Sequence, residues 1–252
     1  MNILFIGNTG SSATNFKKGL LKYKDISRVD VMFDSNECTS GKADTSFLKP
    51  KDYDVVIYSY PFLKTYFKYV KYALEAKAIF HWRGTDLRGL DFKNPIKNKL
   101  YKLIHSAFRK FLLIHKHYHI YSTPDLGWWF RNSTQKNEYI PTPIDTDKFN
   151  ITNTNNRTKH YVFKSGARGY KKNKIKHEDM PGFLNTLKSA EVYPAFNIHP
   201  KIMSNLCAEC LACGVKVKWH EDKDRAWVLN NRSIPICSEK LHQIILKVVR
   251  NS

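Results

Sequence analysis

Apolar residues in the first half of the chain form short runs, separated by stretches with helical spacing. The runs predict strands at residues 1–7, 29–33, 54–60, 78–82 and 119–123. The third run is apolar and unbroken, which is typical of a parallel strand buried on both faces. After the first run, the spacing of Phe16, Leu20 and Leu21 predicts a helix. A strand followed by a small-residue turn and a helix opens an α/β unit, so we expect a parallel sheet covered by helices.

The pattern changes after Phe149, where a polar loop rich in Asn and Thr spans residues 153–157. We place a domain boundary near Thr152, which predicts two domains at residues 1–151 and 152–252. Apolar spacing in the second half predicts strands at residues 160–164, 192–193 and 215–218 and helices at residues 183–190, 202–212 and 239–249. Both halves are therefore expected to be α/β.

Residues 94–113 are predicted to form an amphipathic helix. Its apolar stripe consists of Ile96, Leu100, Leu103, Ile104, Ala107, Phe108, Phe111 and Leu112. Lysine and arginine side chains lie off this stripe. We expect the stripe to pack on the core of the sheet. The basic polar face also suits anionic lipid headgroups, so membrane contact stays open as an addition to core packing.

Composition narrows the class of protein. The 252 residues are 42% hydrophobic and 25% charged, which excludes a disordered chain, a collagen-like repeat and a small disulfide scaffold. The 42 Lys and Arg residues exceed the 22 Asp and Glu residues by 20, which favours anionic partners such as phosphate-bearing ligands, nucleic acid or an anionic membrane surface. The opening apolar run predicts no signal peptide. We expect a cytoplasmic protein, with peripheral membrane association as an open alternative.

Five cysteines are an odd and sparse set, which favours reduced thiols. Cys207, Cys210 and Cys213 recur every third residue, and this spacing invites a metal interpretation. On one continuous helix, however, three ligands at that spacing would point in different directions around the axis, and no fourth ligand stands at zinc-site spacing. We therefore expect small thiols packed on a helix and no metal.

Four segments of the chain, taken in order, resemble one enzyme family. They are GNTGSS at residues 7–12, FHWRGTDLR at 80–88, STPDL at 122–126 with YIPTPIDTDKF at 139–149, and ECLACGVKV at 209–217. Together they resemble the GT-B-fold glycosyltransferases, particularly the retaining, family 4-like enzymes. This resemblance implies two Rossmann-like domains that face a central cleft, with the acceptor on the N-terminal domain and the donor on the C-terminal one. It also implies transfer of a sugar from a nucleotide-sugar donor to an acceptor hydroxyl, with retention and with no cofactor or metal.

The resemblance also implies roles for particular residues. Glu209 matches a glutamate that contacts the donor sugar or ribose, and His81 matches a histidine that faces the transferring sugar. The residues expected to hold the donor phosphates are Arg168 and Lys172, with Lys171 as an alternative to Lys172. The residues expected on the acceptor side are Gly10, Ser11, Arg83, Asp86 and Arg88. In metal-free enzymes of this family, helix dipoles and cations stabilise the leaving pyrophosphate.

The chain departs from the family pattern in two places. A second glutamate often stands eight positions before the first, and Lys201 occupies that position here. Only about 20 residues separate the Arg168 loop from the strand near Val192, where the family has several strand–helix units, so the C-terminal domain is expected to be reduced.

Structural interpretations of the same residues stay open. His81 would then be a strand-end histidine bonded to backbone, and Glu209 a helix-surface carboxylate. Asp86 and Arg88 would form a local ion pair.

Two other functions also stay open. Net charge and exposed aromatics would suit a basic nucleic-acid-binding protein, although no nucleic-acid-binding motif is present. The short second half would suit a catalytically inactive glycosyltransferase-derived binding module.

Overall fold

The computed structural model describes residues 1–7, 12–32, 52–59, 77–83, 94–114, 117–131, 136–149, 159–163, 190–194, 205–214, 217 and 221–250. The chain forms two compact units. The first unit comprises Met1–Pro141 and Cys237–Ser252, and the second comprises Thr142–Ile236. The acceptor and donor domains expected at residues 1–151 and 152–252 stay a prediction.

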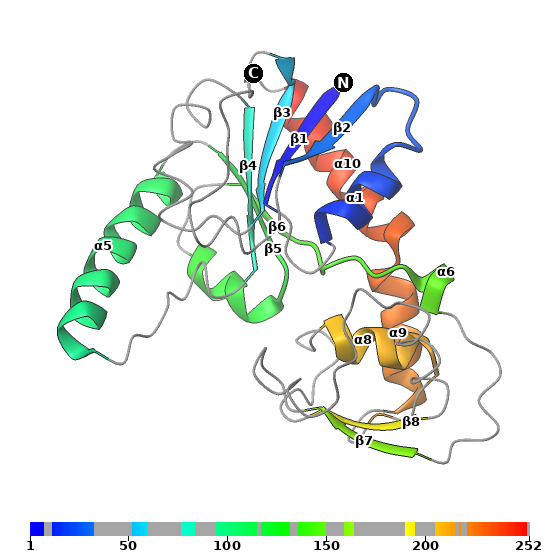
Figure 1. The fold of residues 1–252 in the computed structure, drawn as a ribbon. Helices are drawn as coiled ribbons and strands as arrows, with labels where there is room; N and C mark the ends of the chain where they lie inside the picture. Colours follow the sequence, from blue (N-terminus) through cyan, green and yellow to red (C-terminus); the bar gives the residue numbers. More distant parts are fainter. Residues whose placement is uncertain are drawn as a thin grey trace. The chain divides into compact units, whose positions relative to one another are not determined.

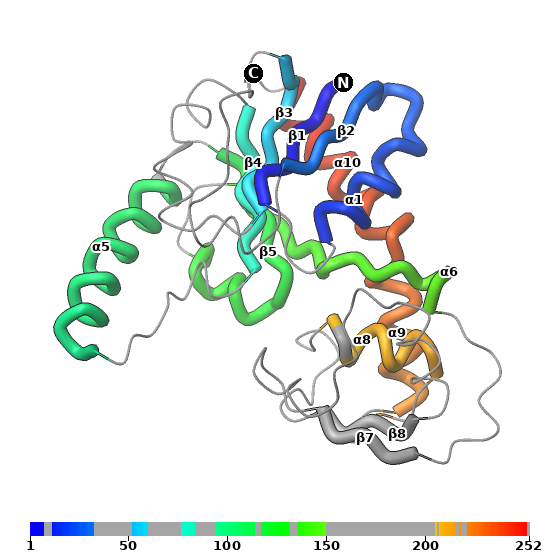
Figure 2. Tube along the Cα trace, in the orientation of Figure 1, coloured from blue at the N-terminus to red at the C-terminus, as the bar shows by residue number. Residues whose placement is uncertain are grey.

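The first unit is built on a six-stranded sheet in which every strand pairs in parallel (Figure 1). Its strands are β1 (Asn2–Ile6), β2 (Arg28–Val31), β3 (Val55–Ser59), β4 (Lys77–Trp82), β5 (Tyr118–Tyr121) and β6 (Asn137–Tyr139). They lie in the order β2-β1-β3-β4-β5-β6, and most of them can be followed along the Cα trace in Figure 2. The predicted parallel α/β sheet is confirmed, and the five predicted strands end within about two residues of the expected ends, as is usual for element boundaries. The edge strand β6 was not predicted.

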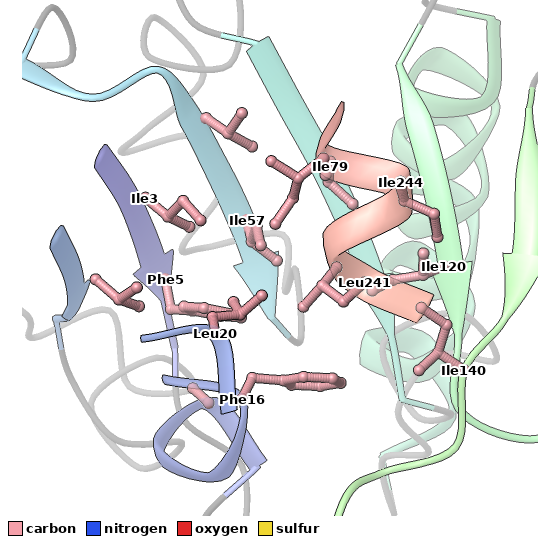
Figure 3. Packing of buried hydrophobic residues seen from close by; sticks show 14 of the residues in the cluster. Ile3, Phe5, Phe16, Leu20, Ile57, Ile79, Ile120, Ile140, Leu241 and Ile244 are labelled. Atoms are coloured by element: carbon pink, nitrogen blue, oxygen red, sulfur yellow. The ribbon is translucent and has the colours of Figure 1, made fainter. Parts of the chain in front are cut away.

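Alternate residues of each strand face opposite sides of this sheet, and each side has its own hydrophobic cluster. On one side, α1 (Ser12–Leu20) and α10 (Ile234–Arg250) cover the strands. Figure 3 shows Phe16 and Leu20 of α1 and Leu241 and Ile244 of α10 packed among strand isoleucines. Each of these side chains is buried, and burial of one such side chain is worth roughly 1.5–3 kcal/mol.

The other side of the sheet is covered by α5 (Pro95–Ile114) and a 3₁₀-helix, η2 (Pro124–Phe130). Asn94 caps the start of α5, because its Oδ1 accepts a hydrogen bond from the Lys97 backbone N–H at 3.0 Å. Phe108 and Leu112 of α5 pack with Leu126 and Phe130 of η2 against β1, β3 and β4. In Figure 1, α5 lies apart from α1 and α10.

The predicted core packing of the whole α5 stripe is wrong. Only Phe108 and Leu112 of the eight stripe residues are buried. The exposed stripe residues are Ile96, Leu100, Leu103, Ile104, Ala107 and Phe111. The stripe is wider than the surface that the sheet offers, so only its edge meets the core.

The helix α10 is longer than the predicted segment 239–249 and closes the first unit. Cys237, Leu241, Ile244 and Ile245 recur at helical spacing and are fully buried against the sheet. The His242 Nε2 lies 2.9 Å from a carboxylate oxygen of Asp25, which ties α10 to the turn after α1.

In the second unit, β7 (Lys159–Phe163) pairs in parallel with β8 (Ala190–Pro194). Its helices in the described part of the chain are α6 (Thr146–Phe149), α8 (Asn205–Ala212) and α9 (Asp222–Arg232). The helix α8 contacts both α6 and α9. Sequence spacing predicted β7, β8 and α8 but not α9. The helix predicted at 183–190 lies mainly outside the described residues, as do Val215, Lys216 and Lys218 of the predicted strand.

Candidate functional site

The carboxyl ends of the parallel strands form the first candidate region. The chain passes from β1 to β2 on one side and then to β3 on the other side of β1, and ligands of such sheets bind where the strand order reverses in this way. Gly7 directly follows β1, and its φ of 95° is accessible to glycine at little cost. A positive φ at this position lets the backbone change direction at the edge where a ligand is expected.

His81 lies near the end of β4 at this edge, and it is completely buried. Its Nε2 lies 2.8 Å from Ser122 Oγ, and its Nδ1 lies 3.4 Å from Ser59 Oγ. Phe16 of α1 covers the ring edge-on, with ring centroids 5.8 Å apart. Burial, with a smaller contribution from the Arg83 charge, holds the pKa of His81 well below its usual range. A neutral ring donates through one nitrogen and accepts through the other, so the two serines match it.

Arg83 follows β4 directly and is half-buried. Its guanidinium donates a hydrogen bond to Ser12 Oγ, at the first residue of α1. This contact joins the end of β4 to the start of α1, because Arg83 directly follows β4 and Ser12 is the first residue of α1. The structure therefore brings His81, Arg83 and Ser12 to the same edge of the sheet.

Several predicted site residues cannot be placed beside these groups. The residues that lie outside the described part of the chain are Gly10, Ser11, Asp86 and Arg88 on the acceptor side and Arg168, Lys171 and Lys172 on the donor side. Their roles stay predictions.

The second candidate region lies in the second unit and is centred on Glu209. This residue is on α8, one turn after Asn205, and its side chain is buried. Burial raises the pKa of Glu209 to about 7, against the opposing effect of the positive charges on Arg232 and Lys148. The glutamate is therefore a buried carboxyl in an electropositive surrounding, and not a helix-surface carboxylate.

Arg232, the last residue of α9, is itself buried and holds three segments of the second unit together. Its Nε–H donates to the Thr142 carbonyl oxygen at 3.1 Å, and its Nη2 donates to Asn205 Oδ1 at 2.6 Å. The Arg232 carbonyl oxygen accepts a hydrogen bond from the Ile144 N–H at 2.8 Å. These bonds fix the guanidinium at the start of the helix that carries Glu209.

A carboxyl with a pKa near 7 has a particular chemical use. At neutral pH it is present in both protonation states, so it can accept a hydrogen bond from one hydroxyl or donate one to another oxygen. Arg232 and Lys148 add positive charge next to it. This combination suits a polyhydroxylated or anionic ligand.

Three cysteines at and just after α8 have a structural role. Cys207, Cys210 and Cys213 are buried, and their thiols are free. Cys207 and Cys210 lie on α8, which confirms the predicted packing of small thiols on a helix for these two, whereas Cys213 directly follows the last helical residue. Burial raises the pKa of Cys207 to about 12 and that of Cys210 well above its usual range, so both stay protonated. Among the described residues, no group of three His, Cys, Asp or Glu side chains is placed to hold a metal ion.

Comparison with known proteins bears on the fold. The chain is similar to the crystal structure of a glycosyltransferase from Rickettsia africae ESF-5, with 10% sequence identity and a TM-score of 0.52. The match covers 100% of this chain and 99% of that chain. The chain therefore shares the overall fold of that protein. No protein family model matches the sequence, and no curated protein matches it. Among the described residues, no helix has both the length and the apolar character needed to cross a membrane.

Sequence reasoning missed two residues of the second region. Lys148 lies in the segment 139–149 that carried the resemblance, but nothing in the segment points to Glu209. Arg232 ends a helix that the apolar spacing did not predict, because Asp222–Arg232 is mostly polar. A capping signal was present there: Asp224 accepts a hydrogen bond from the Glu221 N–H at 3.1 Å, and this pair marks a helix start.

Proposed function

We propose that the protein is a glycosyltransferase that moves a sugar from a nucleotide-sugar donor to an acceptor hydroxyl. The observation that carries the proposal is the full-length fold likeness to a glycosyltransferase, together with a buried glutamate on the α8 segment that resembles the family's donor motif. We further propose retention of the anomeric configuration, a GT-B arrangement of donor and acceptor domains, and a reaction without a metal.

In the proposed enzyme Glu209 binds the donor. A carboxyl with a pKa of about 7 binds sugar or ribose hydroxyls in either protonation state. Arg232 and Lys148 keep the region electropositive, and Arg168 with Lys171 or Lys172 holds the diphosphate. When the glycosidic bond breaks, charge grows on the diphosphate, and fixed cations that face it stabilise the transition state more than the ground state.

The acceptor is assigned to the carboxyl edge of the first sheet. Gly10, Ser11, Arg83, Asp86 and Arg88 line this side in the proposal. His81 is proposed to act at the reaction centre, and its neutral ring would exchange one serine partner for a sugar hydroxyl. Because a neutral histidine accepts a hydrogen bond through one ring nitrogen, the low pKa of His81 is compatible with a hydrogen bond from a sugar hydroxyl.

The test is release of nucleoside diphosphate from a panel of nucleotide-sugars, with and without simple acceptors. We expect one donor to be hydrolysed by the wild-type protein. Glu209→Ala should lower the rate at least a hundredfold, and Glu209→Gln should retain part of the binding. Glu239→Gln changes an exposed glutamate of α10 in the first unit and is the matched control, for which no change is expected.

Two other results would replace the proposal. Donor binding without turnover would identify an inactive glycosyltransferase-derived binding module. Absence of donor binding, together with salt-sensitive binding of random-sequence DNA, would identify a nucleic-acid-binding protein, whose affinity falls steeply with salt because counterions are released. The net charge of +20 makes the second measurement worthwhile.

A further inference from the structure

The first unit covers only one edge of the apolar stripe of α5. Phe108 and Leu112 are buried in the core, whereas Ile96 is 80% exposed, Leu103 is 70% exposed and Leu100 is 57% exposed. Residues three or four apart lie on one face of a helix, so the exposed residues form a continuous stripe. We call this stripe the exposed α5 face; it consists of Ile96, Leu100, Leu103, Ile104, Ala107 and Phe111.

Positive charge borders the exposed α5 face on both sides. Helical geometry places Lys99 and Lys110 along one edge and Lys97 along the other, and all three are exposed. Residues 94–114 contain five Lys and Arg side chains and no Asp or Glu. A long lysine side chain can lay its apolar stem along such a stripe and place its ammonium group at the level of lipid phosphates.

We propose that the exposed α5 face docks the protein on an anionic lipid bilayer. The helix lies in the plane of the interface, with its aliphatic side chains among the acyl chains and its lysines at the phosphates. The first unit is held to the helix through Phe108 and Leu112 on the neighbouring face. This inference does not depend on the proposed function, because it uses no residue of either candidate site.

The pattern of residues favours a bilayer over other occupants. A second copy of the chain docked by the same face would bring lysines against lysines, and six side chains on one helix offer far less than the roughly 800 Å² per partner that stable dimers bury. Nucleic acid is bound by aromatic stacking and phosphate contacts, whereas this face is mainly aliphatic. Aliphatic side chains between rows of lysine match the two chemical layers of an anionic membrane surface.

The experiment is cosedimentation of the full chain with vesicles of phosphatidylcholine containing 30% phosphatidylglycerol, and with vesicles of phosphatidylcholine alone. We expect binding to the anionic vesicles at least tenfold tighter than to the neutral ones. Leu103→Asn should weaken this binding at least fivefold. Leu21→Asn, which changes an exposed leucine just after α1, is the matched control and should leave it unchanged.

The position of the positive charge is tested with two variants that have the same net charge. The triple variant Lys97→Gln/Lys99→Gln/Lys110→Gln should weaken binding at least tenfold, since each lysine near an anionic surface contributes about fivefold. The control Lys18→Gln/Lys22→Gln/Lys24→Gln removes the same charge from exposed positions around the end of α1. Equal loss in the two triple variants would overturn the proposal, because only total charge would then matter. Equal binding to both vesicle types, or a concentration-dependent dimer abolished by Leu103→Asn, would also overturn it.

Discussion

His81 and Glu209 are both buried titratable groups, and in both the dominant cause of the pKa shift is the same. Loss of water favours the neutral form, so burial lowers the pKa of the histidine and raises that of the glutamate. Their surroundings differ. Two serine hydroxyls match the neutral His81 ring, whereas two cations oppose the neutral form of Glu209.

The neighbours of His81 therefore favour the protonation state that burial imposes, whereas the neighbours of Glu209 oppose it. His81 in its present contacts stabilises the end of β4 as a neutral hydrogen-bonding link between strands. At Glu209, desolvation raises the pKa and the nearby positive charges lower it. Such opposed effects on one pKa are typical of functional sites. The two regions can be separated experimentally, because the free energy of unfolding depends on pH with opposite sign for an uncharged histidine and an uncharged carboxyl.

The largest loss in the free energy of unfolding is expected for Arg232→Met. The variant removes the donor to Thr142 and Asn205 and one of the cations near Glu209. Each buried acceptor that loses its donor lowers the free energy of unfolding by about 1–3 kcal/mol, and here two acceptors lose it. Urea denaturation measures it, with Arg225→Met as the control, because Arg225 is only partly buried and donates one long bond of 3.5 Å. Equal losses in the free energy of unfolding of the two variants would show that the hydrogen bonds of Arg232 contribute no more than the single bond of Arg225.

Glu209→Gln tests the carboxyl itself. Between pH 4.5 and about 7 the folded chain keeps a proton that the unfolded chain loses, so this group lowers the free energy of unfolding as the pH rises through that range. The variant should lack this dependence and be more stable than wild type at pH 8 by up to about 3 kcal/mol. At pH 4.5 the two should be equally stable. Urea titrations at four pH values measure the difference, and parallel curves would contradict the raised pKa.

The histidines should give the opposite slope. Burial keeps His81 uncharged and lowers the pKa of His119 to about 3, so the unfolded chain binds protons below pH 6.5 that the folded chain does not. Each group should then lower the free energy of unfolding by about 1.4 kcal/mol per pH unit below 6.5. His81→Gln and His119→Gln should each reduce that slope, and the double variant should reduce it by the sum. In His119→Gln an amide oxygen can still accept the Trp82 Nε1–H bond, which is 3.0 Å in the wild type. If the slope of the free energy of unfolding against pH stayed unchanged, groups other than His81 and His119 would cause the loss of stability in acid.

Sequence patterns were a good guide to the strands of the first unit. Runs such as residues 54–60 are short, apolar and unbroken, as parallel strands buried on both faces typically are. Helical spacing was also sufficient to find α5, but it could not say which edge of the stripe meets the sheet. Phe108 and Ile96 both belong to the apolar stripe, yet Phe108 is buried and Ile96 is 80% exposed.

The candidate site was only partly predictable, for a different reason. Glu209 could be found because it stands in a local motif with Cys213 and Gly214, and Gly214 adopts a φ of 67° just after α8. Arg232 and Lys148 act on Glu209 from distant positions in the chain, and no local pattern encodes such a meeting. Similarly, spacing predicted a closing helix but not that Cys237 and Leu241 would cover the first sheet.

The helix α10 follows the second unit in sequence but packs on the sheet of the first, and this affects folding during synthesis. Strands β1 to β6 are synthesised before the second unit, but Leu241, Ile244 and Ile245, which cover one side of their sheet, are synthesised after it. Until then Ile3, Phe5 and Ile57 lack part of their cover, and exposed apolar surface of this kind makes nascent chains prone to aggregate. Folding of the first unit is therefore completed only after synthesis of the second, and a chain that stops before residue 237 leaves a sheet that chaperones and proteases would recognise as unfinished.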